Sequence, residues 1–127
     1  MDQQKKMTLK DLMIRAEQRK AAGTVSKNVV LPGLGGALTV EKIPLARMLS
    51  LLDGVDAESM TENLSFQVEL IYQCCPLMRN HELQEVYQCA EPTDVVCAVL
   101  DDNLGDVATL AEEILALYGL SGDALKN

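Results

Sequence analysis

Aromatic side chains are scarce in this chain of 127 residues, which contains no Trp, one Phe and three Tyr. Aromatic pairs help to stabilise the facing sheets of all-β proteins, so their scarcity disfavours that class. Apolar residues still make up 48% of the chain, against 24% charged residues, which is enough to bury a core. That core must consist of Leu, Val, Ile, Ala and Met, and this composition favours packed helices.

Long apolar runs are also missing, because no stretch approaches the roughly 20 residues that span a bilayer. The first residues, MDQQKKMTLKDLM, lack the continuous apolar segment of a secretory signal. We therefore expect a cytoplasmic protein without a membrane partner. The length predicts a single domain.

Residue types that support catalysis or metal binding are few. The four cysteines include no C-x-x-C pair, and their spacings match no zinc finger: Cys74, Cys75, Cys89 and Cys97. We interpret them as small apolar residues on helices. The only histidine, His81, has no Cys or Ser partner in a nucleophile setting. We predict no enzyme activity, no catalytic residue, no cofactor and no metal.

A glycine-rich stretch, PGLGG at residues 32–36, raises the question of a phosphate-binding loop. A dinucleotide loop needs a third small residue leading into a helix, but Leu38 stands in that place. No Gly-Lys-Ser/Thr sequence occurs, which excludes a Walker loop. The alternating residues that follow are typical of a strand, so we predict a β-hairpin at 27–43 with strands at 27–31 and 37–43.

The N-terminal segment predicts an amphipathic helix over residues 9–20. Thr8 and Asp11 have the spacing of a capping box, and Gly23 follows the helix. Basic residues occupy the polar face: Lys10, Arg15, Arg19 and Lys20. Such a helix usually packs on its own core, and less often binds a partner or a membrane surface. Our candidate partner-binding residues are Leu9, Leu12 and Met13.

The remainder of the chain is helical by its apolar spacing. The helices are predicted at 45–53, 58–75, 81–89, 92–100 and from about 104 to 119. The apolar stripe of the first includes Leu45 and Leu49, and the third is expected to face inward with Leu83, Val86 and Tyr87. The fold class is therefore mainly α (α+β), with five to six helices and one N-terminal β-hairpin. We divide the chain into a flexible arm at 1–7, a globular domain at 8–120 with a helical bundle at 45–119, and a flexible tail at 121–127.

Charge is distributed unevenly along the chain. Residues 1–47 hold nine Lys or Arg and four Asp or Glu, a net charge of +5. Residues 48–127 hold two Lys or Arg and fifteen Asp or Glu, a net charge of −13. The acidic majority would repel phosphate, so nucleic acid is not an expected partner. Three interpretations stay open: a solvated acidic surface, a holder for a basic or apolar partner segment, and self-association of the basic end with the acidic end.

The order of these elements resembles a family of phage proteins. The hairpin end LTVEKIPLARMLSLLDG and the C-terminal half, VELIYQCCPLMRNHELQEVYQCAEPTDVVCAVLDDNLGDVATLAEEILALYGLSG, are similar to the tail assembly chaperones of the XkdN-like family, found in phages and prophages of Gram-positive bacteria. The resemblance extends over roughly residues 8–122 and consists of element order and apolar spacing.

The resemblance implies a concrete role. Such proteins bind the tape measure protein, keep it soluble and help to recruit tail tube protein during tail assembly in the bacterial host cytoplasm. They are absent from the mature virion. A homo-oligomer is a further partner option. The alternative from another class is a small acidic adaptor or regulatory domain that binds one folded protein partner.

Overall fold

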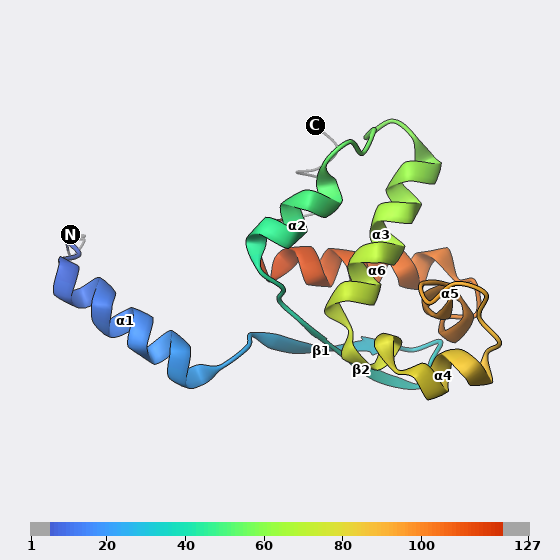
Figure 1. Cartoon of the computed structure of the whole chain (residues 1–127), viewed down its shortest axis with the longest axis horizontal. Helices are drawn as coiled ribbons and strands as arrows, with labels where there is room; N and C mark the ends of the chain where they lie inside the picture. The colour runs from blue at the N-terminus through green and yellow to red at the C-terminus, as the bar shows by residue number, and fades with distance from the viewer. Residues whose placement is uncertain (1–5, 121–127) are drawn as a thin grey trace.

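The computed structural model describes residues 6–120 and has a mainly α fold with one antiparallel β-hairpin near the N-terminus (Figure 1). The predicted tail at 121–127 and most of the predicted arm at 1–7 lie outside the described residues. The elements in chain order are α1 (Leu9–Ala22), β1 (Ser26–Leu31), β2 (Gly36–Glu41), α2 (Leu45–Leu52), α3 (Met60–Cys74), a 3-10 helix η1 (Pro76–Arg79), α4 (His81–Val86), α5 (Asp94–Val99) and α6 (Leu104–Ala116).

Helix α1 stands apart from the remaining elements, which form a compact body (Figure 1). It begins with the predicted capping box, since Asp11 N donates to Thr8 Oγ1 at 3.2 Å and Thr8 N donates to Asp11 Oδ2 at 3.0 Å. It ends before Gly23, whose φ of 78° lies in the left-handed region. None of its residues is buried. The expectation that this helix packs on its own core is therefore wrong.

The hairpin covers one side of the body and has the predicted location. Val29 pairs with Leu38, and these two side chains are buried together with Leu31 and Val40. Alternate residues such as Val30 face outward, as the period of a strand requires. The glycines form the turn, where Gly35 has a φ of 78°.

The turn lies against the start of α6. A Cβ added at Gly33 would come within 3.1 Å of Asp106 Oδ2. Asp101 and Asp106 both border the small depression beside this turn. Because carboxylates repel phosphate, the surroundings of the glycines agree with a structural turn.

Helix α3 is central to the body and contacts α2, α5, α6, η1 and β2. Its packing with α6 buries Phe66, Leu70 and Ile71 of α3 and, on α6, Val107, Leu110 and Ile114. Side-chain oxygens cap both helices: Ser59 Oγ accepts from Glu62 N, and Asn103 Oδ1 accepts from Asp106 N. The apolar residues spaced along α3 and α6 therefore join the buried side of the hairpin in one core cluster.

Some inward positions predicted for the short helices are wrong. In α4, Val86 is 76% exposed and Tyr87 is also exposed, whereas Gln84 is buried and donates from Nε2 to Met78 O at 3.0 Å. A helix of six residues contains fewer than two turns, so apolar spacing alone defines its buried face poorly. In α2 only Met48 is buried, and Leu45 and Leu49 of the predicted stripe are exposed.

The segment after α6 is fastened to the end of the hairpin by Tyr118. Its hydroxyl accepts from Ile43 N and donates to Ile43 O, both at 2.7 Å, and Lys42 Nζ lies 5.0 Å from the centre of its ring. Burial is the main cause that raises the pKa of this phenol, so it keeps its proton at neutral pH. The contact joins residues that are 75 positions apart in the sequence.

We expect Tyr118→Phe to lower the free energy of unfolding by about 1–3 kcal/mol, because two backbone groups of Ile43 lose their partner. Urea unfolding followed by circular dichroism measures this change. Tyr87→Phe is the matched control, since Tyr87 is exposed, and its effect should stay within about 0.5 kcal/mol. Equal effects of the two variants would contradict a stabilising role for the Tyr118 hydroxyl.

No helix in the described part of the chain has the length and apolar character needed to cross a membrane.

Candidate protein-interaction surface

The large apolar side chains in the first half of α1 are exposed. Leu9 is 75% exposed, Leu12 52% and Met13 60%, and Ile14 is also largely exposed. Exposed apolar side chains that occur singly are ordinary, but a continuous group of them on one element indicates a surface that another molecule covers. We call Leu9, Leu12, Met13 and Ile14 the α1 apolar surface.

The three predicted partner-binding residues all lie on α1, but only two of them line the same depression. Leu9 and Met13 line a shallow depression together with Ile14, and the charged side chains of Lys10 and Glu17 complete its lining. Leu12 does not line it. Sequence reasoning missed Ile14, because it lies outside the stripe at intervals of three and four residues that began at Leu9.

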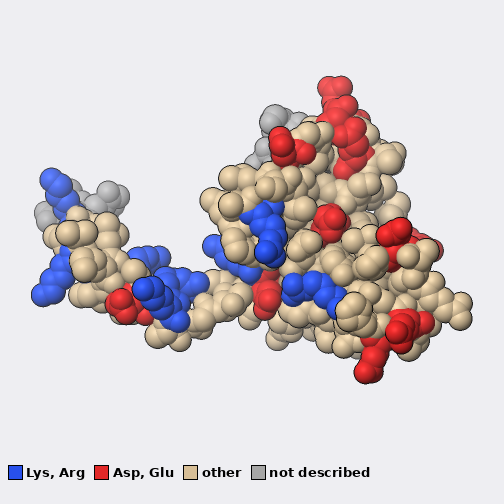
Figure 2. Space-filling view, in the orientation of Figure 1, with Lys and Arg blue, Asp and Glu red and all other residues tan. Residues whose placement is uncertain are grey.

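Charge separates α1 from the body. Lys and Arg gather on α1 and the neighbouring side of the body, whereas Asp and Glu are spread over the more distant parts (Figure 2). Within the body the Lys27 ammonium forms an ion pair with the Glu113 carboxylate, and Arg79 Nη2 lies 3.9 Å from Glu41 Oε1. Both pairs are partly exposed, so each contributes little to stability. The uneven charge in the sequence thus becomes a basic projecting helix beside a largely acidic body.

A second candidate surface is a groove between the start of α3 and one side of α6. It has a volume of about 550 Å³. Glu58 and Glu112 contribute carboxylates to its lining, and no Lys or Arg of the described residues does. Its apolar lining comes mainly from Met60, Leu64, Phe66, Leu104, Ala108 and Leu115. The sequence could not indicate this α3–α6 groove, because it exists only where the two helices pack together.

One side chain at the α3–α6 groove has an unused hydrogen-bonding group. Gln67 Oε1 is buried and has no donor among the residues that the structure describes. A buried acceptor without a partner is costly, so such groups are uncommon in folded proteins.

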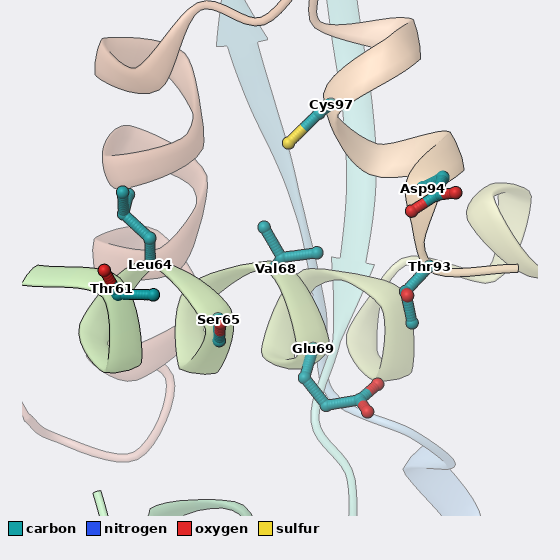
Figure 3. A pocket seen from close by; sticks show the side chains of 8 residues that line it. All are labelled: Thr61, Leu64, Ser65, Val68, Glu69, Thr93, Asp94 and Cys97. Atoms are coloured by element: carbon teal, nitrogen blue, oxygen red, sulfur yellow. The ribbon is translucent and has the colours of Figure 1, made fainter. Parts of the chain in front are cut away.

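A more polar pocket lies between α3 and the start of α5 (Figure 3). Val68 from α3 and Cys97 from α5 point toward one another there, whereas Glu69 points away from them (Figure 3). Asp94 accepts a hydrogen bond at Oδ2 from Glu91 N, 3.0 Å away, in the turn before α5. Burial and then the nearby Asp102 and Asp94 raise the pKa of the Cys97 thiol, so it stays protonated at neutral pH. The Cys97 thiol is therefore not an activated nucleophile.

The other candidate groups for chemistry occupy structural positions. All four cysteines are free thiols; Cys74 and Cys75 are buried, whereas Cys89 and Cys97 are partly buried. His81 is exposed at the first residue of α4. Among the described residues no group of three or more His, Cys, Asp or Glu side chains is arranged to hold a metal ion.

Alkaline pH should destabilise the fold through Cys74. Burial raises the pKa of its thiol from 9.0 to about 12, with Arg79 lowering it in part. Above pH 9 the unfolded chain releases this proton before the folded chain does, so stability should fall as pH rises from 9 toward 12, by about 1.4 kcal/mol per pH unit for one proton. Urea unfolding at increasing pH tests this, and Cys74→Ala should show a smaller slope. An unchanged slope in that variant would contradict the assignment to Cys74.

Comparison of the chain with protein-family models, with curated proteins and with solved structures finds no match.

Proposed function

We propose that this chain is a phage or prophage tail assembly chaperone, which binds the tape measure protein, keeps it soluble and helps to recruit tail tube protein during tail assembly. It acts in the bacterial host cytoplasm and is not part of the mature virion. The observation that most supports the proposal is α1, a helix of 14 residues with an exposed apolar side and no buried residue.

A chaperone for a long helical client needs an exposed apolar surface and needs no catalytic group. Amphipathic helices bind one another through apolar residues at intervals of three and four, and Leu9, Leu12 and Met13 have this spacing on α1. Met13 is flexible and polarizable, which suits contact with client segments of varied shape. The features of α1 therefore support binding to helical segments of an aggregation-prone protein.

The acidic body supports the same role by a different effect. The chain has a formal net charge of −8, and most of its carboxylates lie beyond α1. A large net charge of one sign disfavours association between complexes and keeps them in solution. A client bound at α1 would therefore be attached to a solubilising body.

Co-expression with the product of the neighbouring gene, which the proposal expects to be the tape measure protein, tests the proposal. The partner is expected in the soluble fraction with this chain and in the pellet without it. Size-exclusion chromatography with light scattering should then give a soluble complex that contains several copies of this chain. A partner that stays in the pellet, together with a strictly monomeric chain, would overturn the proposal and favour the adaptor that binds one folded protein.

A further inference from the structure

We propose that the α1 apolar surface of one copy docks in the α3–α6 groove of a second copy of this chain. Among residues 6–120 nothing covers either surface, and both are largely apolar. The proposal concerns the chain on its own and goes beyond the chaperone function, since it does not require a client.

Charge complementarity identifies the occupant. Groove carboxylates come from Glu58 and Glu112. Helix α1 carries a net positive charge among its own residues, with Lys10, Arg15, Arg19 and Lys20 against two carboxylates. A basic amphipathic helix is therefore attracted to a groove with an acidic border, and the complementary charges would select its orientation.

The size and chemistry of the two surfaces also agree. A helix of 14 residues is about 21 Å long, so it can present several side chains to a groove formed by two packed helices. Docking would cover Leu9, Leu12 and Met13 against exposed groove residues such as Met60 and Leu104.

The connection between α1 and the hairpin favours a second copy over the same copy. Lys42 N donates to Val25 O at 2.9 Å, so the hairpin contacts begin immediately before β1. Only Gly23 and Thr24 separate this anchored residue from α1, and α1 points away from the body (Figure 1). Two residues of free chain restrict the return of α1 to its own groove. A neighbouring molecule has no such restriction.

Light scattering of the chain alone, over a range of concentrations, tests this contact. The expected mass is that of two or more copies, falling toward one copy on dilution. Two double variants each remove one side of the contact. The stripe variant changes the α1 apolar surface by Leu12→Glu with Met13→Glu, and the groove variant changes the α3–α6 groove by Met60→Glu with Leu104→Glu. Each should raise the dissociation constant by at least about tenfold. All four side chains are exposed, so neither variant should unfold the body, which circular dichroism checks. Val86→Glu, an exposed apolar position on α4, is the matched control and should not change the mass.

Mixing the two variants makes the test specific. The stripe variant keeps an intact groove and the groove variant keeps an intact α1, so an equal mixture should restore a complex that neither forms alone. A chain that is monomeric at every concentration would overturn the proposal, including the case in which α1 closes on its own groove. An oligomer that tolerates either variant, or a mixture that stays monomeric, would also overturn it. No client is present, so failure of this contact is measured by the mass of the chain alone, whereas failure of the chaperone function is measured by the solubility of the co-expressed client.

Discussion

Ile71→Ala is expected to lower the free energy of unfolding by about 2–5 kcal/mol, the largest stability change among the substitutions considered. Ile71 is fully buried in α3, the helix that contacts α2, α5, α6, η1 and β2. Removing its outer carbons leaves a cavity where several elements meet, and the surrounding backbone can close it only in part. Small domains are stable by only about 5–15 kcal/mol, so the variant should be close to unfolding at moderate temperature.

Leu45→Ala is the matched control for this prediction. It removes the same number of carbon atoms from a side chain that is 57% exposed on α2. Its effect should lie within about 0.5 kcal/mol, because little buried contact is lost. Urea unfolding of both variants and the parent chain gives the comparison. A similar loss in the two variants would show that α3 is not the centre of the core.

Replacing Leu9, Leu12 and Met13 together by Gln is expected to reduce recovery of soluble tape measure protein by at least about tenfold, since an apolar contact is lost while helix propensity is kept. The free energy of unfolding of the body should change little, because these side chains are exposed on a helix with no buried residue. The assay is the co-expression experiment, with the soluble client measured against total client. This prediction rests on the proposed chaperone function.

A control variant that replaces three exposed apolar residues on the body shows whether the location of the apolar residues on α1 matters for client binding. Leu45→Gln, Leu77→Gln and Val86→Gln remove a comparable amount of exposed apolar surface from the body. Client recovery should stay near the parent level in this variant. Equal losses in the two triple variants would argue that general surface hydrophobicity, and not α1, binds the client.

The local elements of this protein could be predicted because their signals are local. Thr8 and Asp11 form the predicted capping box, and Pro44 and Pro76 lie where a helix begins and where one has ended. The alternation of Leu38 and Val40 with Thr39 and Glu41 predicted a strand, and the structure forms β2 there and buries Leu38 and Val40. Each of these signals depends on backbone geometry within a few residues, which the sequence states directly.

The faces of the short helices could not be predicted with the same success. Val86 and Tyr87 were expected to face the core, but both are exposed. Gln84 is buried instead, and its side-chain amide donates a hydrogen bond to Met78 O. The 3-10 helix at Pro76–Arg79 was also missed, and it places that carbonyl beside α4. A partner that lies on another element cannot be read from the spacing of apolar residues on one helix.

The sequence by itself determined a mainly α fold with an N-terminal hairpin, a core of mostly aliphatic side chains, and a basic first segment followed by an acidic remainder. Only the tertiary structure decided that α1 leaves its apolar side uncovered and that α3 and α6 form an apolar groove with acidic borders. The physical reason is that apolar periodicity on a helix shows only that one face is apolar. Whether the rest of the chain buries that face or leaves it exposed depends on which elements pack together in space.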